Sequence, residues 1–185
     1  MVENSNPLNK YFRQPSIYVT LPSKASYPPH VLQQSQSGEI GVQPMTAKDE
    51  IRFKTPDALM NGEGVVEVIQ SCVPQIKDAW QVKSYDLDTI LIAIRIATYG
   101  ETMDFTFTVP GANEQVTHSQ NLPALLDEIK NTQIQDEFVL EDGLKFAIRP
   151  LTYKDMTTAS QQTFTQQKMY SAVQDSQLSD DDKAK

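Results

Sequence analysis

The sequence is poor in the residues that most often build metal, redox and disulfide sites. Its 185 residues include one cysteine, Cys72, and two histidines, His30 and His118. A disulfide needs two thiols and a cysteine-rich zinc module needs several, so neither can form within this chain. Two histidines also argue against a histidine-dominated metal centre. We therefore expect no metal ion and no cofactor.

Basic residues and long apolar runs are also scarce. Lys and Arg number 16 against 24 Asp and Glu, and the acidic surplus lies almost entirely beyond residue 100. Such a surface repels phosphate backbones, whereas nucleic-acid binders carry a basic patch. The longest apolar run, 87–97, is far shorter than the roughly 20 residues of a membrane span. We expect neither nucleic acid nor a membrane as a partner, and an intracellular protein or a component of an assembled particle.

No set of residues in the sequence forms a recognisable catalytic motif. Asp86 and Asp88 fall in the first turn of a predicted helix, where the helix dipole accounts for acidic residues. Cys72 lies on an apolar stripe with no histidine nearby in sequence, which is typical of a buried structural cysteine. We therefore expect a protein that is not an enzyme.

Proline dominates the N-terminal segment. Residues 1–45 hold six of the eleven prolines, which remove backbone donors and keep this segment out of the centre of a sheet. The segment is predicted to be an extended arm with one edge strand at Ile17-Tyr18-Val19. Such arms are often ordered by a neighbouring chain. Two alternatives stay open: the arm adds a strand to a partner, or it folds back on its own domain.

The remaining chain is predicted to be one α+β domain over 46–178, followed by an acidic tail over 179–185. Helices are expected over 46–100, with a first cap at Thr46 and a second helix starting at Thr55-Pro56. The strongest helix covers about 85–99, starts at a Ser84 cap and ends at Gly100. Because it is apolar nearly all round, we expect it to be buried on several sides, at the centre of a helical bundle.

After Gly100 the apolar period changes to two. Met103, Phe105 and Phe107 alternate with polar residues, which predicts a half-buried strand. The turn Glu141-Asp142-Gly143 predicts a hairpin, so the 101–150 region is expected to form a small antiparallel sheet. A capping box at Thr152 and Asp155 is expected to start a last helix over 152–176.

Several segments together resemble one known family. They are residues 6–15, 44–50, 55–62, 65–74 and 86–100, and they resemble the baseplate protein family of T-even-type contractile-tailed bacteriophages, which contains the baseplate hub subunit and the hub assembly catalyst. The resemblance extends from about residue 6 to 175. Relatives follow the Phe-rich strand with a Cys-Pro-x-Cys knuckle that suits zinc. The matching residues here are Val109-Pro110-Gly111-Ala112, so this chain is expected to hold no metal.

The resemblance implies a non-catalytic hub subunit or hub assembly factor that acts through contacts with other hub or tail proteins in the host cytoplasm during assembly. Whether it then stays in the virion, in the tail baseplate, is left open. Whether the chain also forms a homo-oligomer is left open. An alternative is a tail assembly chaperone that binds the tape-measure protein. The arm could add an edge strand to a partner and the last helix could enter a partner's groove. The residues expected to contact a partner are Tyr11, Phe12, Ile17, Tyr18, Val19, Phe164, Met169 and Tyr170.

Overall fold

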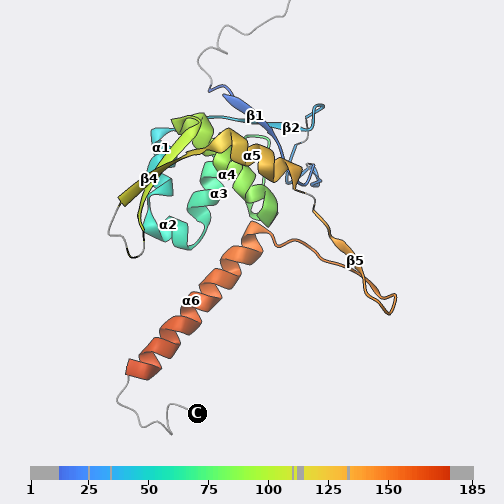
Figure 1. Ribbon diagram of the computed structural model, residues 1–185, viewed down its shortest axis with the longest axis vertical. Helices are drawn as coiled ribbons and strands as arrows, with labels where there is room; N and C mark the ends of the chain where they lie inside the picture. Colours follow the sequence, from blue (N-terminus) through green and yellow to red (C-terminus); the bar gives the residue numbers. More distant parts are fainter. Residues whose placement is uncertain are drawn as a thin grey trace, which may run out of the picture.

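A computed structural model describes residues 13–24, 26–33, 35–109, 111, 115–132 and 134–175 of the chain. Its elements follow in the order β1 (Ile17–Thr20), β2 (Glu39–Val42), α1 (Ala47–Phe53), α2 (Pro56–Met60), α3 (Glu63–Cys72), the 3-10 turn η2 (Ala79–Gln81), α4 (Ser84–Tyr99), β3 (Thr102–Thr108), β4 (Gln115–Asn121), α5 (Leu122–Asn131), β5 (Glu137–Val139), β6 (Lys145–Ala147) and α6 (Tyr153–Asp175). The α+β class expected from the sequence is confirmed (Figure 1).

The core lies in the first half of the chain, which we call the body (residues 13–100, with α5 packed against α4). Helix α4 is the central element and contacts β1, β2, α3, α5 and α6. It buries Leu87, Ile90 and Ile94 on one side, while Ile92 and Ile96 on the other are half-buried. Residues 19–42, α3 and α4 all contribute fully buried side chains to one cluster, so a single core holds them together.

Two of the predicted helix starts have the expected capping geometry. Thr46 accepts from the Asp49 backbone N–H and Asp49 accepts from the Thr46 N–H, which is a capping box. Thr152 and Asp155 form the same reciprocal pair at α6. Ser84 is instead the first helical residue of α4, because Lys83 occupies the cap with extended backbone and no side-chain hydrogen bond.

The N-terminal arm folds back on its own domain wherever it is described, which is the second of the two alternatives. β1 pairs antiparallel with β2, with Val19 opposite Ile40, and both side chains are buried in the core. On the outer face Tyr18 lies opposite Gly41, where a Cβ would come within 3.2 Å of the Tyr18 ring. The described part of the arm is therefore a layer of the body's own core.

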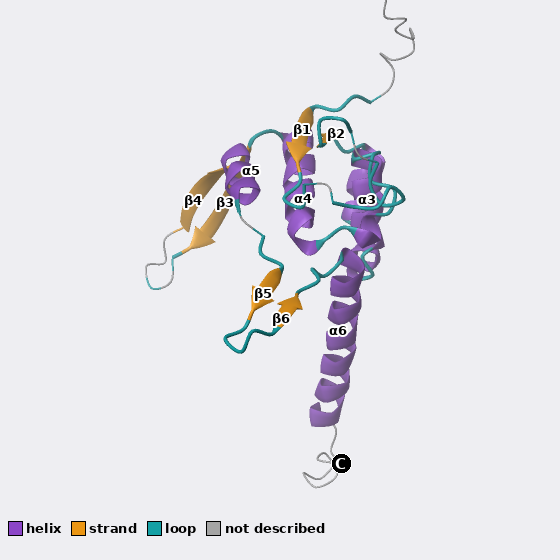
Figure 2. Cartoon of the chain, turned by 90° about the vertical axis from the view of Figure 1, so that its right-hand side faces the viewer, coloured by secondary structure: helices purple, strands orange, loops and turns teal. Residues whose placement is uncertain are grey.

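The strands form three separate two-stranded sheets among the described residues, β1–β2, β3–β4 and β5–β6, instead of the one small sheet expected beyond residue 100. β3–β4, β5–β6 and α6 extend from the body in different directions (Figure 2). The prediction that β3 is half-buried is wrong, because all seven of its residues are exposed. Its alternating pattern is present, but the described residues provide no layer that covers its apolar face.

Candidate partner-binding surfaces

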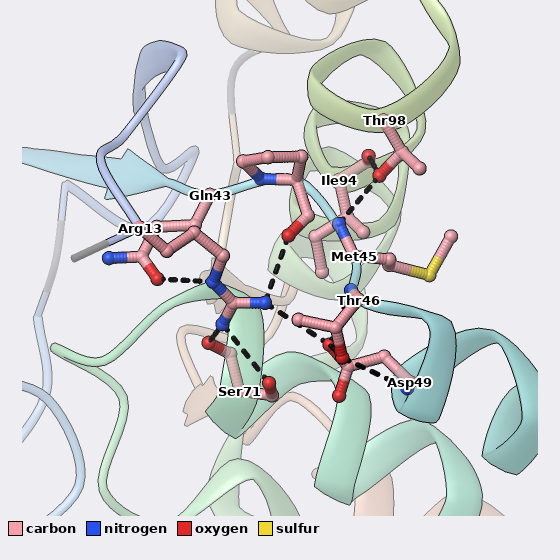
Figure 3. Close-up of polar contacts among 9 residues, drawn as sticks. Arg13, Gln43, Met45, Thr46, Asp49, Ser71, Ile94 and Thr98 are labelled. Atoms are coloured by element: carbon pink, nitrogen blue, oxygen red, sulfur yellow. Dashed lines mark hydrogen bonds and ion pairs between the residues drawn. The ribbon is translucent and has the colours of Figure 1, made fainter. Parts of the chain in front are cut away.

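Arg13 fixes the start of the arm to the body through a set of polar contacts (Figure 3). Its guanidinium donates to Gln43 Oε1 at 2.7 Å, to the Pro44 carbonyl at 2.9 Å and to Asp49 Oδ2 at 3.1 Å, and it also donates to the Ser71 carbonyl. Burial alone would raise the pKa of Asp49, but hydrogen bonds from Thr46, Ser71 and Arg13 outweigh it and lower that pKa. One side chain thus joins the arm, α1 and α3.

A second contact holds the loop after β1 against the first turn of α4. Asp86 is fully buried, and its carboxylate accepts from the Ser23 N–H at 2.9 Å and from the Tyr27 hydroxyl at 2.5 Å. The same hydroxyl accepts from the Lys83 N–H at 2.9 Å. Burial and the Asp86 charge raise the pKa of Tyr27 far above its ordinary value. These contacts make the body a fixed base for the exposed elements beyond it.

The β3–β4 hairpin separates its side chains into one apolar and one polar face. Because paired residues share a face, Met103, Phe105 and Phe107 lie beside Gln120, His118 and Val116, while the opposite face carries Thr, Asp, Ser, Gln and Asn. Phe105 and Phe107 are 41% and 48% exposed. His118 lies against the Phe105 ring with centroids 5.2 Å apart. The apolar face is therefore open to a partner.

The β5–β6 hairpin carries a second open apolar face. Phe138 pairs with Phe146, and their rings stack with centroids 5.4 Å apart. The Leu140 N–H donates to the Leu144 carbonyl, so these two leucines extend the same face to the tip. Both leucines are about half exposed. The hairpin reaches beyond the body with apolar side chains facing solvent.

Helix α6 is attached to the body through its first two turns. Tyr153 stacks on Trp80 with centroids 5.6 Å apart, and Met156 packs against the core. Close approach at this root requires Gly62, whose φ is +82° and whose Cβ would lie 2.9 Å from Thr157. Beyond Ala159, every side chain described on α6 is exposed. The rest of the helix therefore extends free of the body (Figure 1).

The residues predicted to contact a partner fall into three environments. Tyr11 and Phe12 lie outside the described residues. Ile17 is half-buried and Val19 is a core residue, so Val19 cannot reach a partner from β1. Four side chains are exposed, at 44% for Phe164 and between 63% and 64% for the others: Tyr18, Phe164, Met169 and Tyr170. Tyr18 lies far along the chain from the other three, and nothing brings the two groups into one site.

Sequence reasoning missed the two hairpin faces as binding surfaces. Alternation at Met103, Phe105 and Phe107 has the same form whether a strand packs on its own chain or on another one. The signal that could have found them is the lack of a helix to cover them. Among the described residues after β3, the helices are α5 and α6, and α6 is too polar to serve as a core layer.

The residues weighed for catalysis occupy structural positions. Cys72 is a free, fully buried thiol, and burial raises its pKa from 9.0 to about 11, which suppresses the thiolate. Asp86 is fully buried and accepts hydrogen bonds from Ser23 and Tyr27, while Asp88 is exposed. Within the described part of the chain, no three His, Cys, Asp or Glu side chains gather in a way that could hold a metal ion. In the same part, no helix combines the length and apolar character needed to cross a bilayer.

Comparisons with known proteins gave one match. The family model described as T4 bacteriophage base plate protein matches residues 15–182, from the arm through α6. Comparison with curated proteins and with solved structures gave no significant match. The matched range includes all but the first two residues of the body and all three exposed elements, so the match extends over nearly the whole architecture described above. The chain therefore belongs to the T4 bacteriophage base plate protein family, whose members have a structural or assembly role in the phage baseplate.

Proposed function

We propose that this protein is a non-catalytic hub assembly protein of the phage tail baseplate, either a hub subunit or a hub assembly factor. It acts through contacts with other hub or tail proteins, first in the host cytoplasm and then in the tail baseplate. One observation carries the proposal: large apolar side chains are exposed on β3–β4, β5–β6 and α6, which extend from a body that has its own core. Exposed apolar patches of this kind mark sites of protein contact.

The two hairpins support this proposal because neither is expected to be stable on its own. An isolated two-stranded hairpin is marginally stable in water, and it gains stability when its apolar face is covered. Both hairpins here have such a face, with Phe105 and Phe107 on one and Phe146 and Leu144 on the other. We expect each face to be covered by another chain in the assembly.

Helix α6 supports the same conclusion. A helix of 23 residues spans about 34 Å, and most of this one lies away from the body. Between Met156 and Ser171 it has a single charged residue, Lys168, so it lacks the ion pairs that stabilise a solvated helix. Phe164, Met169 and Tyr170 are its exposed large apolar side chains. We expect them to contact a hub partner.

The test is co-expression of the full chain with each hub protein of its phage, followed by affinity capture. The variant Phe164→Ser, Met169→Ser, Tyr170→Ser should fold with an unchanged melting temperature and lose most of the captured partner. Gln166→Ser, on the same exposed helix, is the matched control and should retain capture. Equal capture by both variants would contradict a contact through α6, and failure to capture any hub protein with the unmodified chain would refute the function.

A tail assembly chaperone for the tape-measure protein is the second candidate. It is favoured by the same nearly uncharged helix, which suits a long helical partner more than a globular one. The two candidates separate on two measurements, which are capture of tape-measure protein and mass spectrometry of purified particles. A chaperone captures tape-measure protein alone and is absent from the particle. A hub subunit captures hub proteins and is present in stoichiometric amount.

A further inference from the structure

A groove borders the apolar face of β3–β4 on the body. It has a volume of about 400 Å³, and nearly all of its lining is apolar. It lies between α4, β3 and the start of α5, and its principal lining residues are Leu91, Ile92, Arg95, Met103, Phe105 and Leu125. Because Met103 and Phe105 also belong to the open hairpin face, groove and face form one continuous surface.

Arg95 is the one charged residue in the lining of this groove. Its guanidinium lies over the Tyr99 ring, 4.6 Å from the ring centroid. Among the described residues it has no ion pair and no hydrogen-bond acceptor, and its Nη1 atom is fully buried. A carboxylate brought into the groove would give the Arg95 guanidinium the acceptor that it lacks among the described residues. The surface thus suits an apolar segment that carries a carboxylate.

The tip of the β5–β6 hairpin has this chemistry. Leu140 and Leu144 flank Glu141 and Asp142 in the turn, and both leucines are about half exposed. Asp142 Oδ1 accepts from the Leu144 N–H at 3.0 Å, which fixes the turn, while Glu141 has no ion pair among the described residues. Figure 1 shows the two hairpins well apart, with β4 at one edge of the body and β5 at the other in that view, so the tip would meet the groove of a different molecule.

We propose that the β5–β6 hairpin of one copy binds the groove and β3–β4 face of a second copy, with Leu140 and Leu144 in the groove and Glu141 paired with Arg95. Two different surfaces meet, so the contact is head-to-tail and can continue into a ring or a short chain of copies. The apolar area that the hairpin offers is on the order of 400–500 Å², which gives a weak, concentration-dependent association. This inference does not depend on which hub protein the chain contacts.

The test is sedimentation equilibrium of the full chain from about 1 to about 300 µM, a range that covers micromolar association. The unmodified chain should self-associate. Glu141→Arg, on the exposed tip, should weaken association at least about tenfold, because it places two cations together. Glu137→Arg makes the same charge change on the other face of the same hairpin and should have no effect. A chain that stays monomeric throughout, or equal effects of the two variants, would overturn the proposal.

Two further variants test the pairing and its direction. Arg95→Glu should abolish association, and combining it with Glu141→Arg should restore it. Mixing Arg95→Glu with Leu144→Asp should give dimers and nothing larger, since one variant keeps only its hairpin and the other keeps only its groove. Circular dichroism checks that each variant is folded. If the unmodified chain associates but the mixture does not, the contact is not head-to-tail. If Arg95→Glu does not fold, the proposal is decided by comparing the effects of Glu141→Arg and Glu137→Arg on association.

Discussion

The contact between Tyr27 and Asp86 should be one of the most costly single hydrogen bonds to remove from this fold. Tyr27→Phe deletes a hydroxyl that donates to the buried Asp86 carboxylate and accepts from the Lys83 N–H. A hydrogen bond to a charged group contributes about 1.5–3 kcal/mol, and a polar group left without a partner costs about 1–3 kcal/mol. We expect Tyr27→Phe to lower the free energy of unfolding by about 3–4 kcal/mol, a large share of a small domain's stability.

The assay is urea unfolding followed by the fluorescence of Trp80, the one tryptophan of the chain, in a double-mutant cycle. Tyr27→Phe, Asp86→Ala and the double variant should give a coupling energy of about 1.5–3 kcal/mol. Asp88→Ala is the matched control. Asp88 is close to Asp86 on the same helix but is exposed. Its replacement should therefore lower the free energy of unfolding by less than about 1 kcal/mol, which is the size of a helix-dipole contribution. A coupling below about 0.5 kcal/mol would show that the two side chains do not stabilise each other.

Two further results are expected from the body. Arg13→Lys should destabilise the chain by about 3 kcal/mol and speed amide exchange in β1, because one ammonium cannot serve the acceptors that the guanidinium contacts. The pKa of Cys72 rises from 9.0 in the unfolded chain to about 11, so its contribution is complete below pH 9 and is lost as the pH rises to 11. The free energy of unfolding measured in urea should therefore fall over that window by up to about 3 kcal/mol, and by less in Cys72→Val; equal pH profiles would contradict this.

Much of the body could be predicted because its signals are local. A capping box needs only Thr46 and Asp49 three residues apart. The burial of the central helix α4 is predicted by its apolar residues, which lie on several of its sides. The course of the arm was not predictable in this way. Proline and a short strand pattern allow both a free arm and a folded one, and the choice depends on Arg13 and Tyr27 meeting acceptors from 30 to 59 residues away.

Asp86 shows most clearly what a local sequence pattern cannot predict. In sequence it is equivalent to Asp88, and the helix dipole accounts for both. In the structure Asp88 is exposed, while Asp86 is fully buried and accepts two hydrogen bonds from the arm. A buried carboxylate is tolerated only where donors satisfy it, and those donors come from a loop whose position no local pattern specifies.

The second half of the chain shows why a sequence can predict an element and still mislead about its surroundings. The alternation of Met103, Phe105 and Phe107 with polar residues indicates that one face of β3 is apolar. The alternation does not indicate whether that face is covered by the same chain or by another one. Within this chain, the described residues place no layer over it. An apolar period over 101–151 combined with a core built from residues before 100 is therefore itself evidence of assembly. In the function proposed above, contacts with other chains would supply the stability that these hairpins lack as parts of one molecule.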